Sequence, residues 1–498
     1  MKLFVFAIGG TGARVLRSLT MLLAAGAKVP DNLTIIPILL DMDMQNGDTA
    51  RALNGVELYR TIRNAAYPNG APPAGQSDAP RPFFATPIQS LGTLQSETTQ
   101  ERIGDSFLPQ LTEHQGTFEE FLNVSTMDDI DRELLKVLYD NSAKPTSAEL
   151  KLDLSVGFKG NPNIGSVVFN ALEDSALYKY FVGAFNNETD RIFIISSIFG
   201  GTGSSGFPQL VKLLQEPSQK MPIRNARKGA VTVMPYFALE ENGQSAIDQN
   251  RFNSKTKAAL SYYQNQIHLD SLYYIGDKPG AKLYANVEGG SKQANNAHIV
   301  ELLAAETVLD FANRGAGEFA GAKTYYEYGL RRDDRQLDFV HFADSTFRNV
   351  MQPLIRFAYA SKFYTEYIPA NLRESFAKSL GLQQQLGSST YFVALTKFMG
   401  EAFRKWLAEM GDNDRKFDPF NFQTDFNGLV RAKQIEPKTF MGFGDKGISE
   451  SFLLNEAGDA EPKLLAQYPQ PETRLMQMLM VVADKCMQKL GDLNRQLV

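Results

Sequence analysis

The chain of 498 residues is poor in the side chains that build cross-links and metal clusters, with one cysteine and four histidines. A single cysteine, Cys486, cannot form an internal disulfide or a cysteine-based metal cluster, and this usage is typical of a reducing compartment. The histidines lie far apart without the spacing of metal ligands, which argues against a zinc site.

Long apolar runs are also missing, since no stretch approaches the roughly 18 residues that a membrane span requires. Residues 3–8 follow Lys2 as a short apolar run that resembles a signal peptide, but Gly9 and Gly10 end it and no small-residue cleavage site follows, so a first buried strand is the better interpretation. The net charge of −5 and the pI of about 5.7 argue against non-specific nucleic-acid binding. We therefore expect a cytoplasmic protein without a membrane span or a nucleic-acid partner.

The most informative segment that is present joins a β-branched apolar run at residues 194–198 to a glycine- and hydroxyl-rich loop, Gly200-Gly201-Thr202-Gly203-Ser204-Ser205. A strand, a glycine loop and a helix in this order direct backbone N–H groups and a helix dipole at a phosphate. The loop lacks the Lys-[Ser/Thr] ending of a P-loop. We therefore expect backbone dipoles and a metal, rather than a lysine, to meet the phosphate charge.

A second loop of this kind, Gly9-Gly10-Thr11-Gly12, follows the strand at residues 2–8. Alone it is equally typical of a tight turn or of a dinucleotide-binding Rossmann turn. Two strand-to-helix loops of similar composition are a stronger signal for phosphate binding than one.

A third segment, Gly160-Asn161-Pro162-Asn163-Ile164-Gly165, resembles the phosphate-facing loop of the tubulin/FtsZ superfamily of GTPases, and Phe199 to Ser205 resembles the glycine-rich signature of that superfamily. Phe199 replaces its first glycine and Ser205 its last, which narrows the room on one side of the loop. The opening string Gly-Gly-Thr-Gly-Ala-Arg is similar to that of divergent bacterial tubulin-like proteins. The resemblance covers roughly residues 1–44 and 151–354.

The resemblance also implies candidates for the nucleoside side of the site. Asp43 falls at an acidic position of the family, and Asp277 is the nearest candidate for its guanine contact, although a turn residue is an equal interpretation. Asn295 and Asn296 begin a predicted helix over residues 295–313, where they either contact the base or cap the helix. The residues assigned to nucleotide binding are Gly9, Gly10, Thr11, Gly12, Asp43, Gly160, Asn161, Pro162, Gly200, Gly201, Thr202, Gly203, Ser204, Ser205, Asp277, Asn295 and Asn296, and no protein ligand is assigned to a metal.

In this superfamily an acidic loop of the next subunit in a filament completes hydrolysis. Residues 339–344 resemble that loop, with Asp344 retained, His341 in place of the first acid, and Asp338 close enough to substitute for it. Asp344 and Asp338 are therefore the candidate catalytic residues.

The alternation of predicted strands and helices indicates an α/β fold: a Rossmann-like parallel sheet with helices on both faces and a long central core helix, followed by a largely helical C-terminal domain. We expect a nucleotide-binding domain at residues 1–314, with an insertion at 45–150, and a C-terminal domain at 315–498. Residues 64–100 read as a long loop, and loops are expected at 412–427 and 442–470.

The leading hypothesis is a protein that binds GTP or GDP with Mg²⁺, associates head to tail with itself and hydrolyses GTP. The insertion and the C-terminal domain are candidate surfaces for protein partners. A non-hydrolysing tubulin-like scaffold is the alternative, and a Rossmann-type NAD enzyme built on Gly9–Gly12 is a third that explains one loop of three.

Overall fold

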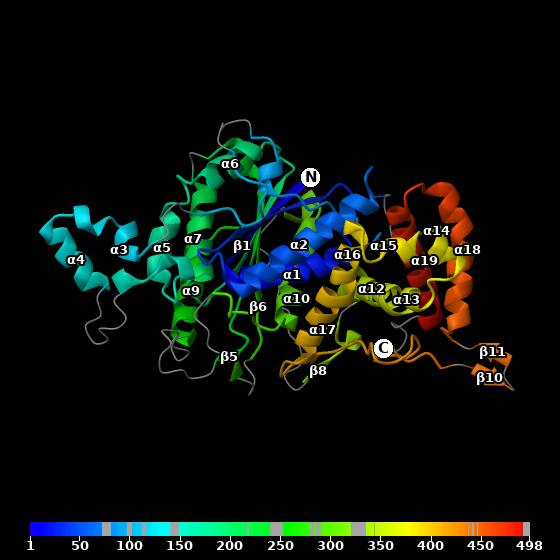
Figure 1. The fold of residues 1–498 in the computed structure, drawn as a ribbon. Coiled ribbons are helices and arrows are strands. Elements are labelled where there is room, and N and C mark those ends of the chain that lie inside the picture. Colours follow the sequence, from blue (N-terminus) through cyan, green and yellow to red (C-terminus); the bar gives the residue numbers. More distant parts are fainter. Residues whose placement is uncertain are drawn as a thin grey trace.

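The computed structural model describes residues 1–71, 81–96, 102–111, 116–139, 149–216, 219–239, 252–278, 283–284, 290–319, 335–342, 344–436, 438–440, 443–445 and 447–491. Figure 1 shows a central sheet with helices around it, an arm at one end and a group of C-terminal helices at the other. In the described part of the chain, no helix combines the length and the apolar character that crossing a membrane requires.

Five parallel strands form the central sheet in the order β2-β1-β3-β4-β6. They are β1 (Lys2–Ile8), β2 (Thr34–Leu40), β3 (Arg191–Ser197), β4 (Arg227–Val233) and β6 (Ser271–Ile275). The first four are almost completely buried, as expected of parallel strands covered on both faces, and β1 and β2 are apolar along nearly their whole length. The predicted α/β fold is confirmed as a parallel sheet flanked by helices.

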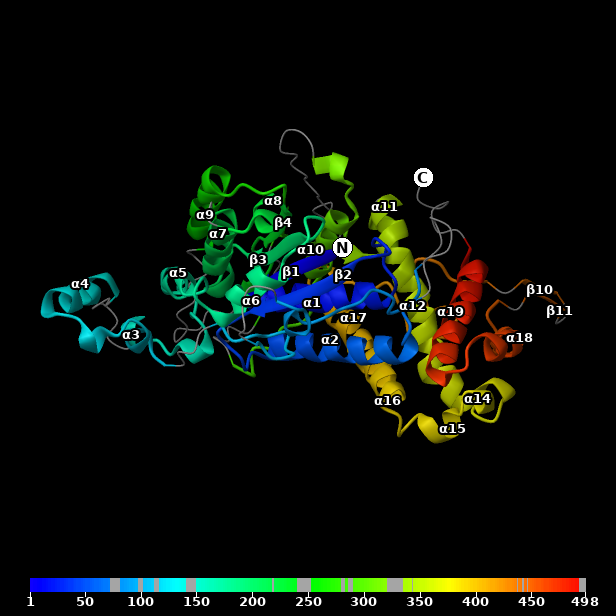
Figure 2. The same cartoon turned by 90° about the horizontal axis from the view of Figure 1, so that it is seen from above.

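Helices cover both faces of this sheet (Figure 2). The helices α1 (Gly9–Ala24), α2 (Gly47–Ala66) and α10 (Ile299–Asn313) belong to one face, where Phe193 of β3 meets Phe311 of α10 with ring centroids 5.3 Å apart. On the other face, Phe4 and Phe6 of β1 pack against Phe181 of α6 (Ala176–Ala184). The helices α5 (Pro162–Asn170) and α7 (Thr202–Gln215) pack against each other.

The segment after β2 does not depart from the sheet at once, because α2 is a 20-residue helix that packs against α1. The expected loop over residues 64–100 therefore begins only after Ala66. Farther on, α3 (Phe118–Phe121) and α4 (Asp129–Tyr139) form the arm that projects from the body in Figure 1.

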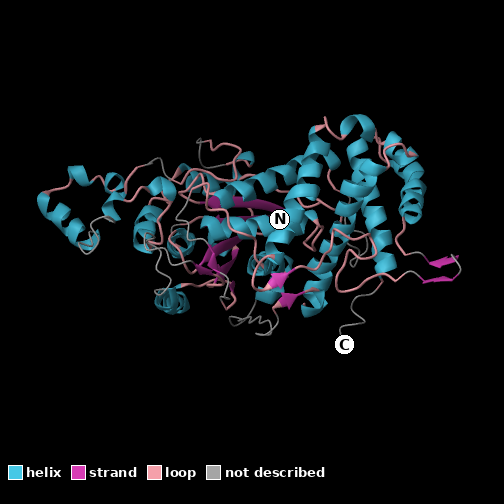
Figure 3. Cartoon of the chain, turned by 60° about the horizontal axis from the view of Figure 1, so that its bottom comes forward, coloured by secondary structure: helices cyan, strands magenta, loops and turns pink. Residues whose placement is uncertain are grey.

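The C-terminal part is mainly helical, as predicted. Its longest helices are α12 (Gln352–Lys362), α17 (Phe403–Gly411), α18 (Glu450–Gln467) and α19 (Pro471–Leu490). The expected loop at 442–470 is wrong for most of its length, because α18 continues through Pro462. Figure 3 shows this helical region and the small β10–β11 pair, Lys438–Phe440 with Phe443–Asp445, beyond it.

The C-terminal helices share the hydrophobic core of the sheet region. Trp406 is fully buried, and its indole Nε1 donates to the hydroxyl of Ser18 on α1 over 3.1 Å. Arg17 of α1 pairs with Glu409 of α17 at 2.6 Å. These contacts fix α17 against α1, the helix that begins at Gly9.

Candidate functional site

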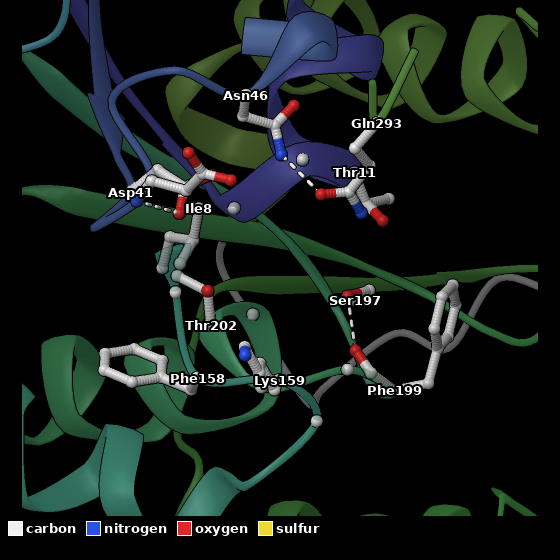
Figure 4. Close-up of a pocket in the computed structure, with 18 of the residues that line it drawn as sticks. Ile8, Thr11, Asp41, Asn46, Phe158, Lys159, Ser197, Phe199, Thr202 and Gln293 are labelled. Carbon is white, nitrogen blue, oxygen red and sulfur yellow. Dashed lines mark hydrogen bonds between the residues drawn. The ribbon is translucent and has the colours of Figure 1, made fainter. Parts of the chain in front are cut away.

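The candidate site lies where the order of strands reverses. β1 pairs with β2 on one side and with β3 on the other, so the connections after β1 and β3 leave the sheet in opposite directions. In open α/β sheets, ligands bind at such a switch point, beyond the carboxyl ends of the strands. A cavity of about 150 Å³ is found there, and both glycine loops line it (Figure 4).

Three helices begin beside this cavity without a capping side chain. α1 starts at Gly9 after Ile8, α7 starts at Thr202 after Gly201, and α5 starts at Pro162 after Asn161. None of the three has an acidic residue in its first turn. Since the first N–H groups of a helix have no partner within it, three partial positive charges remain to be met by an anion.

The neighbouring helix α2 provides the contrast. Asn46 caps it by accepting from the backbone N–H groups of Asp48 and Thr49, and Asp48 adds a carboxylate to its first turn. The residues before α2 also line the cavity, so α1, α5 and α7 differ from it in leaving their first N–H groups without a side-chain cap.

Close contacts at Gly9 and Gly201 bring the three loops together. A Cβ on Gly201 would lie 2.7 Å from Cβ of Phe158 and 3.2 Å from the backbone nitrogen of Gly160. Gly9 has φ of +70°, and a Cβ there would lie 3.1 Å from Cβ of Thr202. The first, second and third loops thus meet at one place, although up to about 190 residues separate them in the chain.

Many of the residues assigned from the sequence line the cavity, while the others do not. The predicted residues on its wall are Gly9, Gly10, Thr11, Asp43, Gly160, Gly200, Gly201, Thr202, Gly203 and Asn295. Those that do not line it are Gly12, Asn161, Pro162, Ser204, Ser205, Asp277 and Asn296.

Several of the predicted residues that do not line the cavity have structural contacts. Ser204 and Ser205 donate their hydroxyls to the carbonyls of Gly200 and Gly201, at 2.5 and 2.7 Å, and so hold the loop. A Cβ on Gly12 would clash with the backbone of Ala7, so this glycine permits α1 to pack closely on β1. The two serine hydroxyls are therefore engaged with the loop itself.

Phe199 packs away from the phosphate loops. Its ring meets the ring of Phe237 with centroids 5.5 Å apart, and its carbonyl accepts a hydrogen bond from Ser197 at 2.7 Å. In Figure 4 the ring lies at the side of the cavity, apart from Thr202.

Lys159 also lines the cavity, and sequence reasoning missed it as a site residue. The loop at residues 200–206 lacks a lysine, as noted, but the loop before α5 brings one to the same cavity (Figure 4). A lysine directly before the Gly-Asn-Pro string was the signal that could have found it.

Two carboxylates from the end of β2 form an acidic wall. Asp43 accepts from the backbone N–H of Gly290 at 2.6 Å and from that of Gln45 at 3.1 Å, so both of its oxygens fix loops. Asp41 is 5% exposed and lines the cavity, and burial raises its pKa to about 7, with Asp43 and Asp48 adding to the rise. Within the described ranges no lysine or arginine forms an ion pair with Asp41.

A buried ion-pair network underlies the cavity. Arg14 of α1 lines it and donates to Glu301 at 2.6 Å, to Asp48 at 2.9 Å and to the hydroxyl of Tyr236 at 2.7 Å. Burial alone would lower the pKa of Arg14, but Tyr236, Glu301 and Asp48 together raise it well above its ordinary value. Arg14 therefore joins α1, α2 and α10 as a permanent cation.

Amide side chains gather on the wall farther from Lys159. Asn46 donates to Gln293 at 2.7 Å, and Asn295 donates to Asp48 at 2.8 Å. A smaller cavity of about 20 Å³ adjoins them, with Asn295, Asn296, Phe237 and His298 among its lining residues. Neither asparagine caps the core helix, because α10 begins at Ile299 and His298 is its cap.

Asp277 lies outside both of these cavities. Its two carboxylate oxygens form a pair with Arg415 in the C-terminal part, one of them at 3.0 Å from Nη2.

Of the two candidate catalytic acids, Asp338 has a described side chain, and it does not line the cavity. Asp338 lies 3.1 Å from Nδ1 of His341 in the short helix Phe339–His341. The backbone of Asp344 begins the helix Asp344–Thr346, and its side chain lies outside the described part.

No protein-family model matches this chain, and neither curated proteins nor solved structures give a significant match.

Proposed function

We propose that this chain is a tubulin/FtsZ-like protein that binds a guanine nucleotide at the cavity between its three glycine-bearing loops. One observation carries the proposal: α1, α5 and α7 all begin beside the cavity without a capping side chain or an acid in the first turn. Each helix start carries roughly half a positive charge, and together they suit a polyphosphate. The position at the strand switch point supports the same site.

Mg²⁺ fits the acidic wall of this cavity. Asp41 presents a buried carboxyl without a cationic partner among the described residues, and Asp43 lies beside it. The described residues contain no group of three or more histidine, cysteine or acidic side chains that could hold a metal alone. Mg²⁺ is commonly bound by one or two carboxylates together with substrate phosphates and water. Bound there, it would neutralise phosphate charge, and Asp41 would hold it as the ionised carboxylate.

The amide wall is the proposed side for the nucleoside. Asn295 lines both the main cavity and the smaller one, which Phe237 and Tyr236 also line. An aromatic wall with amide groups suits a purine base, which offers a flat apolar face and polar edges. The choice of guanine over adenine depends on the resemblance of the loops.

Equilibrium binding tests the proposal. Fluorescent GTP, GDP and ATP would be titrated into the full-length protein with Mg²⁺ and again with a chelator. We expect saturable binding of GTP and GDP that Mg²⁺ strengthens, and weaker binding of ATP. Gly201→Ala, which would push the loop at residues 200–205 away from Phe158 and Gly160, should abolish it. Gly315→Ala is a control outside the cavity, where the nearest atom to an added Cβ is a glutamate oxygen at 3.4 Å. Absence of saturable binding by the wild-type protein would contradict the proposal.

Hydrolysis distinguishes an enzyme from a scaffold. Asp338 does not line the cavity of its own chain, so the hydrolytic form of the proposal requires this acid to reach the site of a neighbouring subunit. Phosphate release per molecule that rises with protein concentration supports catalysis across a head-to-tail contact. Nucleotide binding with no release at any concentration favours the non-hydrolysing scaffold, whose association with itself or other proteins remains part of the proposal.

A further inference from the structure

Lys159 stands out among the residues of the cavity because its charge is not used within the protein. It is half-buried on the cavity wall, and in the part of the chain that the structure describes its ammonium forms no hydrogen bond or ion pair. Hydrogen bonds from Ser155 lower the pKa of Asp153, and the charge of Lys159 lowers it further. A lysine side chain left in this way can bind an anion that enters the cavity.

The backbone of Lys159 is held in a conformation that its side chain disfavours. Its φ is +44°, and Gly157 and Gly160 on either side have φ of +80° and +77°. Glycine would adopt this conformation freely, whereas a residue with a Cβ loses about 1–2 kcal/mol. Strain of this kind is concentrated at ligand-binding loops, so it points to a use for the side chain.

Charge balance also calls for a cation at this place. Three helix starts supply about +1.5 charges, and the two charges of Mg²⁺ would be offset by Asp41 and Asp43, so part of the charge of a nucleoside triphosphate remains uncompensated. Arg14 is already engaged with Glu301 and Asp48, so it adds no free charge. Lys159 is the lysine on the cavity wall, and it lies beside the helix start at Thr202 in Figure 4.

The position of Lys159 indicates which phosphate it would meet. Asn46 and Gln293 lie on one side of the glycine loops in Figure 4, and Lys159 lies on the other. If the nucleoside occupies the amide wall, as the proposed function holds, the phosphates extend across the starts of α1 and α7 toward Lys159. We propose that Lys159 binds the terminal phosphate of a nucleoside triphosphate and makes the site selective for triphosphates over diphosphates. This inference rests on the proposed function.

Binding of GTP and GDP to four variants tests the inference. Lys159→Met removes the charge, Lys159→Arg keeps it, and Lys159→Gly removes it while relieving the backbone. Lys151→Met is the matched control, because Lys151 is an exposed lysine eight positions earlier and does not line the cavity. Charge-assisted hydrogen bonds account for the expected loss of about ten- to hundredfold in GTP affinity for both Lys159→Met and Lys159→Gly.

The pattern across nucleotides decides the outcome. GDP affinity should change less than about threefold in the same two variants, since the diphosphate would not reach Lys159. Lys159→Arg should retain most of the GTP affinity, and Lys159→Gly should unfold at the wild-type temperature or above. GTP affinity that is unchanged in Lys159→Met, or GTP and GDP affinities that fall equally, would overturn the inference and leave the nucleotide site intact. A wild-type protein that binds no nucleotide would overturn both proposals.

Discussion

Arg14 and Glu301 form a buried ion pair, 2.6 Å between Nε and Oε1, across 287 positions of the chain. The pair joins α1, which begins at Gly9, to the core helix α10. Tyr236 donates its hydroxyl to the same carboxylate oxygen at 2.6 Å, so one acid orients two neighbours of the cavity. The shape of the candidate site therefore depends on charges that lie beneath it.

Removing Arg14 is expected to destabilise the fold strongly. Arg14→Met leaves the carboxylates of Glu301 and Asp48 buried without this cation, and loss of one partner of a buried pair typically costs about 3–5 kcal/mol. Urea denaturation would measure the free energy of unfolding. The double variant Arg14→Met with Glu301→Gln should lose less than the sum of the single variants, because the neutral amide no longer needs the cation. Lys136 forms an exposed pair with Glu133, so Lys136→Met should leave the midpoint of the urea transition unchanged. Equal shifts of the midpoint in Arg14→Met and Lys136→Met would contradict this prediction.

Two adjacent glycines should respond differently to the same substitution. Gly201→Ala places a Cβ 2.7 Å from Cβ of Phe158 and should cost about 1–3 kcal/mol as the loops move apart. Gly200 has φ of +84° and no atom within 4 Å of an added Cβ, so Gly200→Ala should cost only the strain of about 1–2 kcal/mol. We expect nucleotide binding to be lost in the first variant and retained in the second. Binding that survives equally in both would show that the contact between the loops is not required.

The sequence predicted the sheet and its two glycine loops well, because strands and tight turns follow from local patterns. Apolar β-branched runs such as that ending at Ser197 are sufficient to identify buried parallel strands. The helix α2 was missed although its buried apolar residues, Ala52, Val56, Tyr59, Ile62 and Ala66, recur at helical spacing. Asp48 is buried on the same helix, where Arg14 and Arg51 pair with its carboxylate. No pattern of the sequence shows that a distant arginine will neutralise such groups.

The same limit applies to the site. Gly9 and Gly201 could be found from the sequence, since positive φ or close approach requires glycine there. Lys159 adopts a left-handed conformation without being glycine, so its turn is not evident from the residue type. Asn46 and Gln293 meet across 247 positions, and such a contact is visible only in three dimensions.

Asp41 should make the stability of the free protein decrease as the pH rises. Its pKa is about 7 in the folded state and about 3.9 in an unfolded chain. Between these values the folded state holds one proton more, so the free energy of unfolding falls as the pH rises from 4 to 7. Asp41→Asn removes this dependence and should be more stable than the wild type at pH 8, by up to about 4 kcal/mol. If Mg²⁺ and nucleotide bind at this wall, the variant should also gain less stability from them; identical gains would show that Asp41 does not contact the metal.

His298 should make the stability of the protein decrease as the pH falls, which is opposite to the effect of Asp41. Burial lowers its pKa to about 4, with Arg14 and Arg415 lowering it further and Asp277 and Asp414 opposing them. The neutral ring accepts from the backbone N–H of Val300 at 3.1 Å and so caps the core helix. Since the unfolded state takes up a proton below about pH 6.5, the contribution of His298 is lost as the pH falls toward 4.

The substitution His298→Asn isolates this effect, because asparagine caps helices well without titrating. As the pH falls from 6.5 to 4, the free energy of unfolding of the variant should rise relative to that of the wild type by up to about 3 kcal/mol. Urea denaturation at each pH would measure this difference. Asp41 and His298 partly cancel in the wild type over this range, so its own profile would look flatter than either group predicts. Each single variant should therefore show a steeper slope, of opposite sign, and the double variant should return to a shallow one. Parallel profiles for wild type and His298→Asn would mean that the ring is not the buried neutral cap on which α10 begins.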